Sequence, residues 1–166
     1  NTYFIENQLQ SFEVSSAYGI TKEDMAAMKE LDGIDEVEGG YSTIGLLNAD
    51  NGTGKLLIRV YSLLDTMNLP TVIEGSLPVS DNQVAIEQKM AEQEGIQVGD
   101  MIAVEHEGEL KRDTFLVTAI INQPSYCCAR SLDTRGMSNK GIGSAYYYIA
   151  LPEEAFDSSY FNNCYT

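Results

Sequence analysis

The sequence predicts an α+β fold, and the stretch from residue 74 to residue 104 is its clearest basis. The pattern there indicates a strand and then a helix over 87–94. Gly95 stands where a helix needs a residue that tolerates positive φ after its last turn. Val98-Gly99-Asp100 then turns the chain into an alternating strand at 101–104. Short apolar strands before and after this stretch are the second basis, and together they are typical of a small mixed domain.

The composition is that of a globular protein with an acidic surface. The 166 residues, 43% of them hydrophobic, can bury the core of one ordinary domain or of two small ones. The formal net charge is −15. Such a surface repels phosphate backbones and anionic lipid heads, so we expect no nucleic-acid ligand and an electrostatic preference for cationic partners. Solubility alone is the competing interpretation of this charge.

Neither end of the sequence has the pattern of a natural terminus, and we expect it to be part of a longer protein. No run approaches the roughly 18 to 20 apolar residues that span a bilayer. Cys127 and Cys128 are adjacent, and Cys164 lies far along the chain. A disulfide to Cys164 suits an oxidising compartment and three free thiols suit a reducing one, so both remain open.

The first part of the chain predicts a strand and a helix. Residues 12–16 alternate apolar and polar positions, as a half-buried strand does. Thr21 is the expected N-cap of the helix, and Gly33 is its expected end. Met25 and Met28 lie on one face of this helix, where we expect them to fill the core.

Two further strands, at 41–47 and 55–64, are expected to form a hairpin around a turn rich in Asn and Gly. The order up to residue 64 is therefore β-α-β-β. A boundary between two portions of the chain is expected near residue 67.

The second part predicts further strands and no recognisable active site. Residues 115–121 form the most apolar run and are expected to be central in a sheet, and residues 145–151 form a later strand before a short helix that starts at Pro152. His106, the single histidine, is expected to be an exposed turn residue. A phosphate loop at 52–55 is rejected because Leu56 follows where Ser or Thr is needed. We expect no catalytic residue, cofactor or metal ligand.

The stretch 125–144 is a long loop with little apolar pattern and three basic residues. A loop of this length in a compact domain is usually functional or mobile. Tyr126, Arg130 and Arg135 are the candidate contact residues for a partner. A mobile surface loop without a partner is the competing interpretation.

Several short sequence elements occur in an order that is typical of one protein family. They are the helix and its exit at 20–37, Ile73-Glu74-Gly75-Ser76-Leu77-Pro78, Gln83-Val84-Ala85-Ile86, Gly95–Val104 and Tyr148–Phe156. In order and spacing they resemble the extracytoplasmic core domain of MacB/FtsX-type ABC transporter permeases. Ser76 departs from that pattern, in which Arg is commoner.

The resemblance implies two subdomains. A porter-like β-α-β-β portion would span 11–66, a smaller inserted α/β portion would span 67–160, and residues 161–166 would begin the return to the porter-like part. Because the sequence stops there, we expect a half-complete porter-like portion with an exposed sheet edge that a neighbouring chain could cover.

The function that the resemblance implies is that of a non-catalytic domain on the extracytoplasmic face of a bacterial cell membrane. It would couple ATP hydrolysis by a cytoplasmic ABC ATPase, through the full-length permease, to a peptide, a lipid-linked substrate, a protein partner or a second copy in a homodimer. A secreted or surface interaction or adhesion module is the alternative, and an enzyme whose carboxylates cannot be paired is the third hypothesis.

Overall fold

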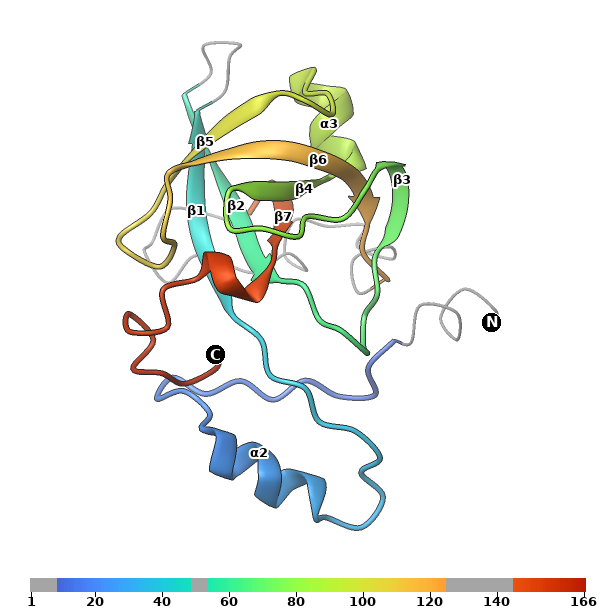
Figure 1. The fold of residues 1–166 in the computed structure, drawn as a ribbon, viewed down its shortest axis with the longest axis vertical. Coiled ribbons are helices and arrows are strands. Elements are labelled where there is room, and N and C mark those ends of the chain that lie inside the picture. Colours follow the sequence, from blue (N-terminus) through green and yellow to red (C-terminus); the bar gives the residue numbers. More distant parts are fainter. Residues whose placement is uncertain (1–8, 49–53, 125–144) are drawn as a thin grey trace.

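The computed structural model describes residues 9–48, 54–124 and 145–166. Figure 1 shows a barrel of strands and, below it, the isolated helix α2 between two extended segments. The described strands are β1 (Ser42–Asn48), β2 (Lys55–Ser62), β3 (Thr71–Gly75), β4 (Gln83–Glu87), β5 (Met101–Glu105), β6 (Thr114–Asn122) and β7 (Tyr147–Leu151). The helices are α2 (Lys22–Lys29), α3 (Gln88–Glu94) and the short 3₁₀ helix η3 (Glu153–Ala155). The fold is thus mixed, as the sequence predicts, and the described strands form one large sheet.

The sheet closes on itself. Its strand order is β3-β6-β4-β7-β2-β1-β5, and β5 pairs again with β6. The β1–β2, β1–β5, β4–β7 and β5–β6 pairs are antiparallel, whereas β2–β7 and β4–β6 are parallel. Strand β3 pairs antiparallel with the end of β6 and extends the ring at one side. The expected central position of the apolar 115–121 run is confirmed, because β6 has three partners.

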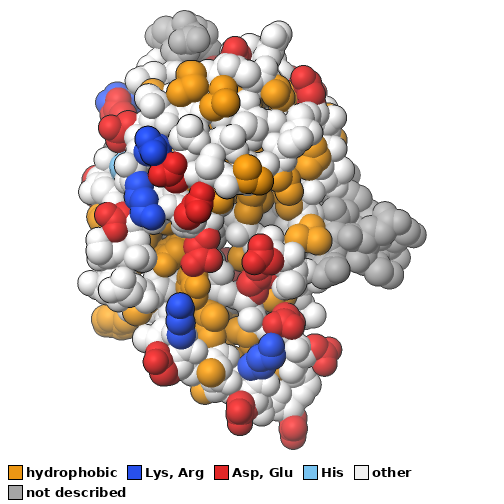
Figure 2. Space-filling view, viewed as in Figure 1, with side chains coloured by type: hydrophobic (Ala, Val, Ile, Leu, Met, Phe, Trp, Pro, Cys, Tyr) orange, Lys and Arg blue, Asp and Glu red, His pale blue; other side chains and the backbone are white. Residues whose placement is uncertain are grey.

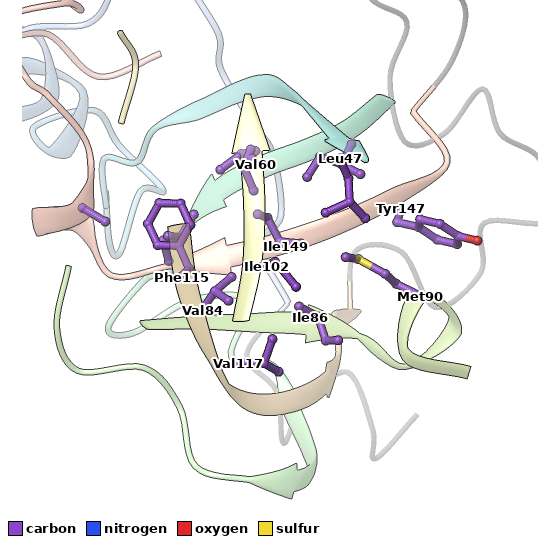
Figure 3. Close-up of a cluster of buried hydrophobic side chains, with 14 of the residues drawn as sticks. Leu47, Val60, Val84, Ile86, Met90, Ile102, Phe115, Val117, Tyr147 and Ile149 are labelled. Atoms are coloured by element: carbon purple, nitrogen blue, oxygen red, sulfur yellow. The ribbon is translucent and has the colours of Figure 1, made fainter. Parts of the chain in front are cut away.

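The core fills the barrel. Figure 3 shows side chains from strands all around the ring converging there, with Met90 of α3 beside Tyr147 at one end. Phe115, Ile149 and Met90 are fully buried. Strand β7 is buried at all five positions, because Tyr148 and Ala150 on its other face pack in a second cluster with residues of β4 and β6.

The stretch 74–104 folds as predicted. Helix α3 ends at Gly95 with φ +70°, a left-handed conformation that glycine adopts without steric cost. At the next turn, Gly99 has φ +101° and its amide donates to Val117 O at 2.8 Å. The carboxylate of Asp100 accepts from the Gln97 amide, also at 2.8 Å. This turn therefore starts β5 and fixes it against β6.

The predicted hairpin is confirmed as β1 and β2, but these two strands belong to the same sheet as the later strands. Strand β2 pairs with β7 and β1 pairs with β5, so one sheet crosses the expected boundary near residue 67. The physical reason lies in β2, where Leu57, Ile58 and Val60 are all buried, so that both of its faces are covered. The hairpin thus belongs to the barrel and not to a separate β-α-β-β unit over 11–66.

Two expectations near α2 need correction. Residues 12–16 run without strand pairing in the described structure, and Phe12 and Val14 are 71% and 58% exposed. Helix α2 ends at Lys29, before the predicted end at Gly33, and it contains no buried residue. Met25 and Met28 are only half-buried, because the helix packs against no second helix or paired strand among the described residues.

Candidate binding groove

A groove of about 330 Å³ separates the α2 region from the barrel. In Figure 2, hydrophobic side chains lie exposed between the barrel and the α2 region, and mostly acidic side chains, with some basic ones, lie around them. The lining comes from α2, from the extended segments on both sides of it, from the barrel end around Tyr61 to Asn68, and from the C-terminal residues Tyr165 and Thr166. Its volume is at the lower end of the range for ligand pockets.

The groove floor is built from apolar residues that recur at every third position. Met25, Met28, Leu31, Ile34 and Val37 all line it. The first two lie one turn apart on α2, and the others continue the row along the extended segment that follows. The helical part of this row is the sequence signal for the groove, because residues three apart lie on one face of a helix.

A capping box holds the start of α2. The Thr21 hydroxyl accepts from the Asp24 amide at 3.1 Å, and the Asp24 carboxylate accepts from the Thr21 amide at 2.9 Å and from its hydroxyl at 2.7 Å. The Thr21 amide, followed by its hydroxyl, lowers the pKa of Asp24 below its ordinary value. The predicted N-cap is therefore confirmed, and it satisfies amides that begin the helix.

Polar contacts tie the extended segments to the barrel end. The Glu38 carboxylate accepts from the amides of Asp65, Thr66 and Met67, the last two at 3.1 Å. Asn68 accepts from the Gln10 amide at 3.1 Å, and its side-chain amide donates to Gln10 Oε1 at 2.6 Å. Both sides of the groove are thus anchored to one short segment of the barrel.

The C-terminal residues close one end of the groove. Ile20 and Tyr165 exchange backbone hydrogen bonds of 2.8 and 2.9 Å. The Thr166 amide donates to Gly40 O at 3.1 Å, and the Thr166 hydroxyl accepts from the Ser42 amide at 2.8 Å. Residues before and after α2 are therefore hydrogen-bonded to the same two C-terminal residues.

An aromatic cluster connects these C-terminal residues with the barrel. The ring of Tyr41 lies 4.9 to 5.3 Å from the ring centroids of Phe156, Phe161 and Tyr165. The Tyr165 hydroxyl donates to Glu153 Oε1 at 3.0 Å. Burial, followed by this hydrogen bond and the charge of Glu153, raises the pKa of Tyr165 to about 12. Burial also raises the pKa of Tyr41, with Glu153 adding to the effect.

The charged residues in the described lining of the groove are all acidic. Glu13, Glu36 and Glu38 line it, and its described lining contains no Lys or Arg. Lys29 lies outside the lining and pairs with Glu36 at 3.0 Å, where both side chains are about half exposed. Residues 9–41 as a whole hold eight Asp and Glu against two Lys. The groove therefore joins an apolar floor to an acidic rim.

His106 is not the exposed turn residue that was expected. Its side chain is only 7% exposed, because the turn folds over the ring. Nδ1 accepts from the amides of Gly108 at 3.1 Å and Leu110 at 3.4 Å. Nε2 lies 3.1 Å from Arg112 O and 3.0 Å from the Asp113 carboxylate. The histidine organises the β5–β6 turn and is not among the residues that line the groove.

The contact residues proposed from sequence, Tyr126, Arg130 and Arg135, lie outside the described residues, as do Cys127 and Cys128. Cys164 is half-buried, and it forms no disulfide with another described residue. Its thiol lies 3.6 Å from Asn162 O.

Two kinds of feature are missing from the part of the chain that the structure describes. None of its helices has the length and hydropathy to cross a membrane. Within the described ranges, no three His, Cys, Asp or Glu residues converge as metal ligands would.

The fold is similar to that of an extracellular domain of an ABC-type transporter. The crystal structure of the extracellular domain of the noncanonic ABC-type transporter YknZ from Gram-positive bacteria matches 96% of this chain and 76% of its own, with a TM-score of 0.53 and 13% identity. The periplasmic region of MacB from Actinobacillus actinomycetemcomitans gives a TM-score of 0.46 and 10% identity, over 88% of this chain and 59% of that one. The resemblance expected from the sequence elements is thus confirmed for the fold. No family model and no curated protein matches the chain.

Proposed function

We propose that this chain is a non-catalytic extracytoplasmic domain of an ABC transporter permease. Its role is to couple ATP hydrolysis by a cytoplasmic ATPase to a change of shape outside the membrane. The observation that carries the proposal is the fold likeness to a transporter extracellular domain over 96% of the chain. The order of the short sequence elements supports it independently.

We propose further that α2 and its flanking extended segments are the porter-like portion, to which residues 161–166 return. The contacts of Tyr165 and Thr166 with Ile20, Gly40 and Ser42 support this assignment. The exposed Phe12 and Val14 beside the groove support the idea that a neighbouring chain covers this portion. The barrel then serves as the scaffold on which the portion is held.

Localisation in the source cells tests the function. An antibody raised against the 166-residue chain is used to probe membranes washed with alkaline carbonate, and intact cells treated with an external protease. We expect the antigen to stay in the membrane pellet, to be cleaved from outside, and to copurify with an ATP-binding subunit. Recovery in the cytoplasm would overturn the proposal. Recovery in the culture medium without a membrane pool would favour the secreted interaction module.

A further inference from the structure

We propose that the groove beside α2 binds a cationic amphipathic segment of another polypeptide. The motivating juxtaposition is an apolar floor that includes Met25 and Met28, with Met67 of the barrel end also lining the groove, beside a rim of three glutamates. This inference names the partner of the domain proposed above and rests on that function for its biological meaning.

The apolar floor is suited to peptide side chains. Met28 faces the groove from α2, which has no buried residue, and Leu31 lines it just beyond the end of the helix, so apolar area remains for a partner to cover. Leu31 is 61% exposed although it belongs to the apolar row. Methionine side chains are flexible and polarizable, and such surfaces accept apolar anchors of different shapes. The floor therefore selects for apolar residues without demanding one particular side chain.

The rim selects for positive charge. Glu13 and Glu36 accept hydrogen bonds from Gln10 and Lys29, and these exposed contacts leave the carboxylates in solvent. At the barrel end, the Glu38 carboxylate accepts hydrogen bonds from backbone amides. Lys29, which pairs with Glu36, lies outside the lining, and the described lining itself holds no cationic side chain, so the charged groups that a partner's lysines or arginines would meet within the lining are carboxylates.

Charge also decides between partners. A second copy of the chain would place its own residues 9–41, with the same excess of six acidic residues, against this groove. Like charges disfavour this contact. Anionic lipid is disfavoured for the same reason. A segment that alternates Leu or Phe with Lys or Arg satisfies floor and rim together, as in helix-in-groove recognition.

A peptide-binding measurement tests the proposal. The probe is an amphipathic helical peptide of Leu and Lys with one Trp, and its matched partner has Glu at every Lys. The chain contains no Trp, so Trp fluorescence reports on the peptide alone. We expect the Lys peptide to bind and the Glu peptide to fail. Raising the salt from about 0.01 to about 1 M shortens the Debye length from about 30 to about 3 Å and should weaken binding.

Two variants with the same charge change locate the site. Met28→Lys places a cation in the groove, whereas Ala26→Lys places it on an exposed position of α2 outside the lining. We expect Met28→Lys to weaken the Lys peptide at least about tenfold, which corresponds to about 1.4 kcal/mol, and Ala26→Lys to have a much smaller effect. Circular dichroism and thermal melts check that both variants fold.

The outcomes separate the alternatives. Equal binding of the Lys and Glu peptides, equal effects of the two variants, or no binding of the Lys peptide to the folded chain would each overturn the proposal. So would sedimentation that shows a dimer closing the groove. All measurements use the purified chain, so their failure is distinct from failure of the localisation experiment, which concerns the transporter role.

Discussion

Gly39 lies against the ring of Tyr165 at a distance that leaves no room for a side chain. A Cβ atom built on Gly39 would also lie 2.6 Å from the sulfur of Met25. Tyr165 belongs to the aromatic cluster around Tyr41, and Met25 belongs to α2. The absence of a side chain at residue 39 therefore allows Tyr165 of the aromatic cluster and Met25 of α2 to approach the same point.

Gly39→Ala should lower the free energy of unfolding by about 1–3 kcal/mol, because the ring or the methionine must move aside. Gly40→Ala is the matched control. Its Cβ would meet Ser62 Oγ at 3.0 Å and Leu64 Cδ2 at 3.1 Å, contacts that a small shift relieves. Denaturant unfolding of both variants makes the comparison, and equal losses would contradict the tight packing at Gly39.

Alkaline unfolding should depend on Tyr165. Its pKa in the folded chain is about 12, above the ordinary value of 10.0. Between these values the folded chain binds more protons than the unfolded chain, so the stabilisation is complete below about pH 10 and is lost as the pH rises towards 12. Tyr165→Phe keeps the ring but cannot titrate, so its stability should fall less steeply over this window. Parallel slopes for the two proteins would refute the role of Tyr165.

The β5–β6 turn should depend on the His106 imidazole. Because Nδ1 accepts two backbone amides, the neutral ring carries its proton on Nε2, which nitrogen NMR shifts can verify. His106→Ala leaves those amides without their acceptor and should cost about 1–3 kcal/mol of stability. His106→Asn places an acceptor at the equivalent position and should recover part of the loss. If the Asn and Ala variants are equally unstable, the acceptor role is wrong.

The N-cap of α2 should control local order. Thr21→Ala removes the hydroxyl that accepts from the Asp24 amide and should cost the helix about 1 kcal/mol. Since α2 has no buried residue, packing cannot compensate, and hydrogen exchange of the first-turn amides should become faster. Thr21→Ser keeps the hydroxyl and should preserve protection. Unchanged exchange in Thr21→Ala would show that the cap does not limit opening.

Local structure is predictable from this sequence where one residue type has one physical use. Gly95, the turn at 98–100 and the N-cap at Thr21 each satisfy a local backbone requirement, and the structure confirms them. Strand β6 is recognisable because an apolar run must be covered on both faces.

Long-range pairing is less predictable. The residues of β2 are compatible with a hairpin edge and with a barrel strand, and only its parallel pairing with the distant β7 decides. The groove could not be predicted for a similar reason. Met25 and Met28 have the spacing of core residues, and only the tertiary structure decides whether another element covers them. His106 seemed exposed because its neighbours are polar, although its backbone partners bury it.

The closed ring of strands determines where this molecule can bend. Sliding β6 by one residue would break its register with β3, β4 and β5 together and turn buried side chains outward. The barrel should therefore respond to an applied force as one stiff body. The extended segments around Ile20 and Gly40 lie outside this ring, and backbone hydrogen bonds from the C-terminal residues hold them.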